Sequence, residues 1–188
     1  MRGRNGNAQN ETPAARGRRL FGLLALLYFA QGLPSGLIAK ALPALLRDQG
    51  VSLSTIGFTS MLALPWALKF AWAPLVDRYG SRRQWLLALN ALTMALMLLV
   101  ASRDFAAWVE VLPLLFAVLF CANLVSATQD IATDGYAVSK LKPEWRGIGN
   151  SIQVVGYKLG MVMGSGGLLW LVAHHGWQAS YGGLACLM

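Results

Sequence analysis

The chain has 188 residues, of which 56% are hydrophobic and only 13% are charged, with a mean hydropathy of +0.49. This composition excludes an ordinary water-soluble domain, and the length, which matches six membrane spans of roughly 20 residues with short loops, excludes a large extramembrane catalytic domain. A net charge of +8 would suggest nucleic acid in a soluble protein. In an apolar chain it is better explained by basic residues held on the cytoplasmic side, so no nucleic-acid partner is expected.

Residues 1–19 predict a disordered basic cytoplasmic tail, because they carry five arginines and no apolar periodicity. A cleaved signal peptide is the alternative. The apolar stretch after Arg19 continues for more than twenty residues and further apolar runs follow it, which favours a membrane bundle.

Residues 20–188 predict a transmembrane helical bundle with spans at about 20–46, 55–76, 85–101, 108–136, 148–173 and 179–188. Helices are favoured over barrel strands by the span lengths and the lack of period-two alternation. The last run is about half a bilayer crossing long, so we interpret it as an incomplete sixth helix. The fold class is therefore an all-α polytopic membrane protein. Prolines within the spans are expected to bend the helices rather than end them: Pro34, Pro43, Pro65 and Pro113.

The distribution of lysine and arginine predicts the orientation. With the tail inside, eleven basic residues lie in cytoplasmic segments, and only Arg47 and Arg103 lie in the opposite loops. This bias places the N-terminus in the cytoplasm. Three further lysines fall within the predicted spans: Lys40, Lys69 and Lys158.

A stripe of glycines runs along the predicted span 148–173, at Gly156, Gly160 and Gly164. Small residues four apart let another helix approach closely, so the stripe indicates helix packing, with a sliding surface in a carrier as the minor interpretation. Lys158 lies about 200° around the helix from Gly156, on the opposite face, and shares a polar line with Ser151 and Ser165.

Ionisable residues lie deep in three spans. Asp130 and Asp134 are one turn apart, next to Gln129, and Asp130, Lys69 and Lys158 reach similar depths, roughly 12–15 Å from the nearest polar segment. A lysine this deep needs a carboxylate or a watery cavity. Two interpretations stay open: a static ion pair that fixes helix packing, or a substrate or proton site that exchanges partners.

The first span carries a polar stripe formed by Tyr28, Gln31 and Ser35. Such a stripe either faces a cavity that binds a polar ligand or makes helix-to-helix hydrogen bonds, and both interpretations stay open. Lys40 lies near the outer end of the span, where its side chain can reach the interface.

Two other classes of protein compete with a carrier. An intramembrane enzyme is suggested by the paired aspartates, but a metal-dependent transferase needs further acids downstream, and only Glu144 follows Asp134. A structural membrane subunit predicts that the buried charges tolerate joint apolar replacement. Neither cysteine, Cys121 or Cys186, belongs to a metal-binding pattern, so no metal and no cofactor are expected.

The turn from Ala73 to Arg83 resembles the Asp-Arg-x-Gly-Arg-Arg signature of the major facilitator superfamily, and departs from it at Ala73 and by an additional residue, Ser81. Three longer stretches, residues 69–78, 127–135 and 146–161, are similar to the AmpG-type muropeptide permeases and their acetyl-CoA transporter relatives.

This resemblance implies that the chain is the N-terminal six-helix half of a two-half carrier, with a C-terminal half as its partner. The expected function is alternating-access transport of a small polar solute across the bacterial inner membrane, by proton-coupled import of muropeptide-like substrates or by siderophore uptake. The resemblance implies a cytoplasmic gate formed by Asp77, Arg78, Arg82 and Arg83. It also implies that Gln129, Asp130, Asp134 and Lys158 line or brace a substrate and proton path, to which we add the polar stripe of the first span, Tyr28, Gln31 and Ser35.

Overall fold

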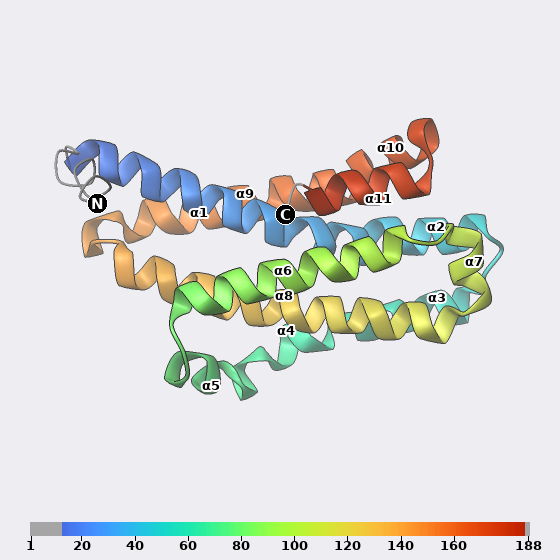
Figure 1. The fold of residues 1–188 in the computed structure, drawn as a ribbon, viewed down its shortest axis with the longest axis horizontal. Coiled ribbons are helices and arrows are strands. Elements are labelled where there is room, and N and C mark those ends of the chain that lie inside the picture. The colour runs from blue at the N-terminus through green and yellow to red at the C-terminus, as the bar shows by residue number, and fades with distance from the viewer. Residues whose placement is uncertain (1–12, 187–188) are drawn as a thin grey trace, which may run out of the picture.

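A computed structural model describes residues 13–186, with side chains described for residues 17–183. Every secondary-structure element in that range is helical, and the long helices run side by side along one axis (Figure 1). Four stretches among the described residues are long and apolar enough to cross a membrane: Gly17–Asp48, Arg82–Ala101, Leu112–Lys140 and Pro143–His175. The chain is therefore an all-helical, polytopic membrane protein, as the composition indicates.

The first long rod consists of α1 (Pro13–Gly36), a π-helical turn over Leu37–Ala41, and α2 (Leu42–Asp48). It begins seven residues before the predicted span, so residues 13–19 are helical and not part of a disordered tail. Proline suits the first turn of a helix, and the two alanines after Pro13 favour helix formation. The rest of the predicted tail, residues 1–12, lies outside the described residues.

The predicted span 55–76 is not one continuous helix. It is divided into α3 (Leu53–Gly57), a 3-10 helix over Phe58–Ala63, α4 (Leu64–Leu68), a 3-10 turn over Lys69–Ala71, and α5 (Ala73–Arg78). Pro65 and Pro74 lie in the first turns of α4 and α5. Since proline lacks an amide proton and its ring crowds the preceding turn, each one interrupts the helix just before it.

A short turn leads from α5 into the next long helix. Ser81 and Gln84 form a capping box that starts α6 (Arg82–Ala101), so the additional serine in the signature has a structural role. α7 (Phe105–Glu110) is separated from α8 (Leu112–Lys140) by a break at Val111, and Pro113 lies in the first turn of α8. The predicted span 108–136 is thus divided, because Pro113 starts a helix rather than bending one.

The last rod runs from α9 (Arg146–Val162) through a π-helical turn over Met163–Gly167 into α10 (Leu168–His175). Gly176, with a φ of 78°, reverses the chain into α11 (Trp177–Cys186), which packs against α6.

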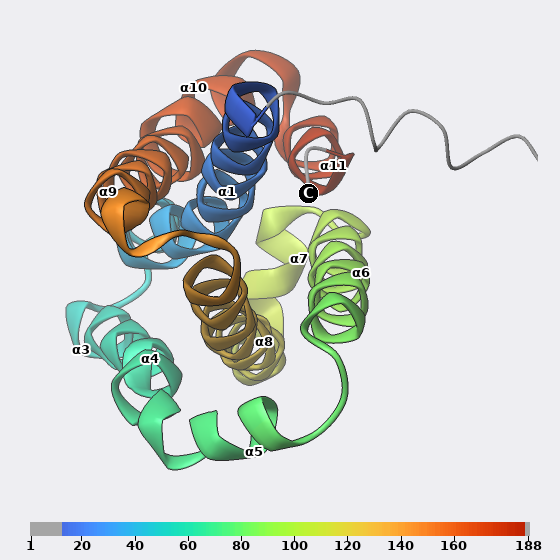
Figure 2. The ribbon, with the colours of Figure 1, turned by 90° about the vertical axis from the view of Figure 1, so that its left-hand side faces the viewer.

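α8 occupies the middle of the bundle, with α1, α6 and the α3–α5 segment around it (Figure 2). The largest apolar cluster gathers towards the α2 and α7 end and includes Leu46, Trp108, Leu115, Trp177 and Tyr181. The indole groups of Trp108 and Trp177 both donate to the carbonyl of Val100, at 2.9 and 3.2 Å, which ties α7 and α11 to the end of α6.

The closest helix contact lies between α1 and α9. Gly156, Gly160 and Gly164 are buried against α1, and a Cβ atom at Gly160 would collide with the carbonyl of Phe29. The approach is reciprocal, because Gly32 and Gly36 on α1 leave no room for a Cβ against the backbone of α9. We call this contact the glycine seam. It fixes the rotation of α9 and therefore decides which of its residues face outward.

Candidate functional site

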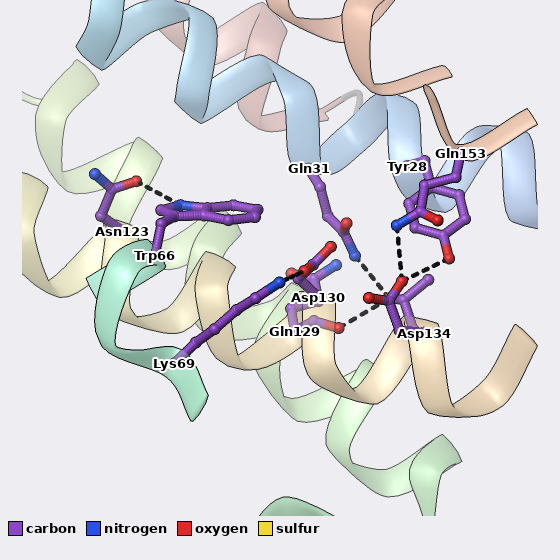
Figure 3. Close-up of polar contacts among 10 residues, drawn as sticks. Tyr28, Gln31, Trp66, Lys69, Asn123, Gln129, Asp130, Asp134 and Gln153 are labelled. Carbon is purple, nitrogen blue, oxygen red and sulfur yellow. Dashed lines mark hydrogen bonds and ion pairs between the residues drawn. The ribbon is translucent and has the colours of Figure 1, made fainter. Parts of the chain in front are cut away.

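The centre of the site is an ion pair between two helical segments. Lys69, in the 3-10 turn after α4, places its Nζ 2.5 Å from Oδ2 of Asp130 on α8 (Figure 3). The side chain of Asp130 is 6% exposed and that of Lys69 is 35% exposed. The carboxylate is therefore buried, while the side chain of its partner is partly exposed.

Asp134, one turn further along α8, has a different environment. Its Oδ1 accepts hydrogen bonds from the hydroxyl of Tyr28 at 2.8 Å and from the amide of Gln153 at 2.9 Å (Figure 3). These donors come from α1 and α9, and both are neutral. A cavity of about 270 Å³ adjoins this carboxylate. The two aspartates thus share one helix face, but Asp130 pairs with a charged ammonium group whereas Asp134 accepts hydrogen bonds from neutral groups.

Buried amides connect the region between the two aspartates. Gln31 donates to the hydroxyl of Thr133 at 2.6 Å, and that hydroxyl donates to the carbonyl of Gln129 at 2.9 Å. The Oε1 atom of Gln31 is buried without a hydrogen-bond donor among the described residues. Gln129 itself donates to Asn90 on α6 at 2.8 Å. This polar row crosses the bundle inside an otherwise apolar interior.

A cavity of about 500 Å³ is connected to the ion pair through Trp66, which lines the cavity and contacts Lys69. Four helical regions line it, and its polar lining residues are Ser35, Thr59, Ser60, Trp66, Asn123 and Tyr157. Trp66 and Tyr157 meet edge to face with their ring centroids 5.8 Å apart, and Nζ of Lys69 lies 5.3 Å from the ring centroid of Trp66. We call this space the central cavity.

The α3–α5 segment is attached to α8 by polar side chains. Asn123 donates to the carbonyl of Leu62 and accepts from the indole of Trp66, and Trp72 donates to Thr128 at 3.1 Å. With the Lys69–Asp130 pair, these contacts hold an irregular segment against a regular helix. The sequence analysis missed Asn123, Trp66 and Tyr157, although one signal was available, an asparagine inside a long apolar run.

The polar stripe of the first span makes both kinds of contact that its sequence allows. Tyr28 and Gln31 make helix-to-helix hydrogen bonds, Tyr28 also lines the cavity next to Asp134, and Ser35 lines the central cavity. The expectation that Lys158 joins the buried charge cluster is wrong for the described residues, because Lys158 is exposed and no acidic side chain among them pairs with it. The glycine seam explains this, since it turns the opposite face of α9 outward.

The signature turn forms a looser arrangement. Arg82 lies 3.6 Å from Asp77, with side chains that are 37% and 56% exposed, and its guanidinium packs against Gly135 of α8. Arg78 lies over the ring of Tyr79, at 5.9 Å from the centroid, and Arg83 is exposed. The turn is therefore tied to α8 through Arg82.

Comparison with known proteins is consistent with this geometry. The sequence profile of the acetyl-coenzyme A transporter 1 family matches residues 20–178. The anhydromuropeptide permease of Escherichia coli K12 is 38% identical over 178 residues, which cover 88% of this chain and 34% of the relative. A Rickettsia conorii protein named "Putative transporter AmpG 4" is 30% identical over 174 residues, which cover 87% of this chain and 41% of the relative.

These relatives are named as a permease and a transporter and not as enzymes, in agreement with the exclusion of an intramembrane enzyme. The chain spans between a third and two fifths of the length of these two relatives. The matched residues include the ion pair, both aspartates and the signature turn. This chain belongs to the acetyl-coenzyme A transporter 1 family, within the group of AmpG-type permeases.

Proposed function

We propose that this chain is the N-terminal half of a secondary active transporter that moves a polar solute across the bacterial inner membrane by alternating access. The proposed reaction is proton-coupled import of muropeptide-like substrates, with the N-terminus in the cytoplasm. The proposal extends the name of the Escherichia coli relative, an anhydromuropeptide permease, to this chain.

The observation that carries the proposal is the buried ion pair beside the central cavity. Charged groups at membrane depth are costly unless they face each other or water, and they commonly mark substrate or proton routes. The cavity of about 500 Å³ has the size of a small-molecule site, and its walls combine hydroxyl, amide and aromatic groups. Such walls suit an uncharged sugar-like portion of a cargo, because rings stack on aromatic faces while hydroxyls and amides exchange hydrogen bonds.

The remaining site residues take supporting roles in this proposal. Tyr28 holds Asp134 through its hydroxyl, and Gln31 and Gln129 form the polar row between the aspartates through their contacts with Thr133 and Asn90. Asp77 and Arg82 form the cytoplasmic gate with Arg78 and Arg83, and the Asp77–Arg82 contact biases the closed state. The face of α9 that carries Lys158 faces the C-terminal half, since hydrocarbon is a poor environment for an ammonium group.

The test is uptake by the full-length carrier in membrane vesicles with an imposed inward proton gradient. A panel of radiolabelled anhydromuropeptides and siderophores is offered to the wild type and to the Asp130→Asn variant. We expect the wild type to accumulate a muropeptide, and Asp130→Asn to reduce this accumulation about tenfold or more, as expected for loss of a proton-accepting group.

The outcomes separate the alternative functions. Accumulation of siderophores alone would assign the chain to siderophore uptake within the same group. Absence of uptake for every solute in the panel, with folded carrier present in the vesicles, would favour a structural subunit and overturn the transport proposal. The matched control is Gln178→Ala, which removes an exposed amide of α11 and should leave uptake unchanged.

A further inference from the structure

We infer that Lys69 binds a negatively charged group of the cargo, and that Asp130 takes up a proton when Lys69 leaves it for the cargo. This inference rests on the proposed transport function and adds the charge class of the cargo, the residue that recognises it and the stoichiometry of coupling. The cargo is an organic anion that presents a carboxylate or phosphate to the central cavity.

The first argument is the unequal exposure of the ion pair. The side chain of Lys69 is 35% exposed and that of Asp130 only 6%, so an approaching anion meets the side chain of Lys69 before that of Asp130. Lys69 also lies in a 3-10 turn between two prolines and not inside a regular helix. A small change in this turn moves the ammonium without breaking a long helix, because 3-10 segments have weaker hydrogen-bond geometry than α-helices.

The second argument is the charge of the cavity wall. The lining residues of the central cavity carry hydroxyl, amide, aromatic and apolar groups but no ionised side chain. Lys69 lies behind one lining residue, with its Nζ 5.3 Å from the ring centroid of Trp66, and is the nearest cation that the described contacts connect to this wall. A negatively charged group in the cavity is therefore drawn to Lys69, and charge-assisted hydrogen bonds to a carboxylate or phosphate are about twice as strong as neutral ones.

The third argument is that the buried carboxylate cannot lose its cation without compensation. A buried charge that loses its partner is strongly destabilised, and protonation removes that charge. Anion binding at Lys69 and proton binding at Asp130 therefore favour each other, as linkage requires. The proton adds to a carboxylate oxygen of Asp130 as the ammonium leaves, and no covalent bond of the cargo changes. One proton and one negative charge enter together, so transport of a monoanion is electroneutral.

Asp134 does not serve this exchange, because its hydrogen bonds come from the neutral groups of Tyr28 and Gln153, which an anionic cargo does not draw away. The other titratable or charged side chains on the elements around this part of α8 are Tyr28 of α1, Tyr157 of α9, Asp77 and Arg78 of α5, Arg82 of α6, and Lys69 itself. Of these, Lys69 forms the contact with Asp130.

The experiment uses the full-length carrier in proteoliposomes and two probes. One is a radiolabelled anhydromuropeptide with one free carboxylate and a net charge of −1, and the other is the same molecule with that carboxylate amidated. We expect Lys69→Gln to lower uptake of the charged probe by about 10- to 100-fold, and uptake of the amidated probe by less than about twofold. Lys40→Gln, which removes an exposed lysine of the first rod, is the matched control and should change neither.

Asp130→Asn gives the second measurement. We expect it to keep exchange of the charged probe across the membrane while losing accumulation driven by a pH gradient. The double variant Lys69→Gln with Asp130→Asn has no charge in the pair, so it should fold as well as the wild type and carry the amidated probe without dependence on the pH gradient. The amount of folded carrier is determined for every variant.

Several results would overturn the inference while transport itself stands. The first is an equal loss of uptake of both probes in Lys69→Gln. The second is uptake of the monoanionic probe that is driven by an imposed membrane potential at constant pH. The third is accumulation driven by a pH gradient in Asp130→Asn. If folded wild-type carrier takes up neither probe, nor any other solute of the panel, the proposed function fails and this inference fails with it.

Discussion

Two helix contacts in this bundle differ in the groups that form them. At the glycine seam, α1 and α9 touch backbone to backbone, and side chains are absent where the helices cross. The α3–α5 segment is instead held on α8 by side chains, through Asn123, Trp66 and Trp72 and the Lys69–Asp130 pair. Apolar side chains gain little by leaving lipid, so close packing and polar contacts are the two means by which membrane helices associate.

This difference indicates which of the two helix contacts can rearrange. The seam has one arrangement, because any shift brings backbone atoms into collision or opens a void. The polar contacts have alternatives, since a carboxylate, an amide or an indole can exchange one partner for another or for water. Prolines and 3-10 turns occur in the α3–α5 segment, which is also the segment that borders the central cavity. The following substitutions test this contrast.

The largest expected effect is at the seam. Gly160→Leu places a side chain where Phe29 leaves no room even for a Cβ, and we expect it to destabilise the protein by at least about 3 kcal/mol or to prevent folding. The measurement is denaturant unfolding in detergent followed by tryptophan fluorescence. Gly166→Leu is the control, because no atom lies within 4 Å of a Cβ there, and it should remain folded.

The next effect is at the ion pair. Lys69→Met leaves the buried carboxylate of Asp130 without its cation and should destabilise the protein by about 3 kcal/mol at neutral pH. Adding Asp130→Asn removes the unpaired charge, so the double variant should recover to within about 1 kcal/mol of the wild type. The same unfolding measurement checks both. If the double variant is as unstable as the single one, packing rather than charge dominates this contact.

A smaller effect is expected at the hydrogen bonds between α8 and the α3–α5 segment. Asn123→Ala removes the acceptor for Trp66 and the donor to Leu62, which should cost about 1–3 kcal/mol. Unfolding of this variant is compared with that of Asn150→Ala, whose side chain is exposed on α9. Equal stability of the two variants would contradict the role given to Asn123.

The smallest effect is expected at the signature turn. Arg82→Gln removes an exposed ion pair and should change the free energy of unfolding by less than about 1 kcal/mol, because water and salt screen the charges. The difference from Arg83→Gln, which loses an exposed arginine without a described acidic partner, should vanish at high salt. A salt-independent loss in Arg82→Gln would point to its packing against Gly135 as the main contribution.

Much of the fold could be predicted from local sequence features. Apolar runs predicted the long helices, and the glycines at 156, 160 and 164 predicted a close contact on one face of α9. The division of the second span was missed, because the expectation that prolines only bend membrane helices gave too little weight to Pro65 and Pro74 lying nine residues apart in one run. The start of the first helix was placed too late, since Pro13 and the alanines after it were assigned to the tail.

The site was predicted in part. The sequence indicated that a lysine deep in a span needs a carboxylate or a watery cavity, and it placed Lys69 and Lys158 at a depth similar to that of Asp130. Depth alone does not distinguish them, because it follows from counting residues along a helix, whereas pairing depends on how each helix is rotated and which helices are neighbours. Nor did any local pattern indicate that Trp66 and Tyr157 meet, because they come from helical segments about 90 residues apart.

Local sequence features identify this chain as a helical membrane protein with ionisable residues far from the ends of three predicted spans, because hydropathy, helix length and rise per residue are local quantities. The tertiary structure decided that Asp130 pairs with Lys69, that Lys158 faces outward and that the central cavity opens beside the α3–α5 segment. Two sets of long-range contacts cause this. The glycine seam sets the rotation of α9 against α1 and turns Lys158 outward, and the hydrogen bonds of Asn123 and Trp72 hold the α3–α5 segment on α8, where Lys69 meets Asp130.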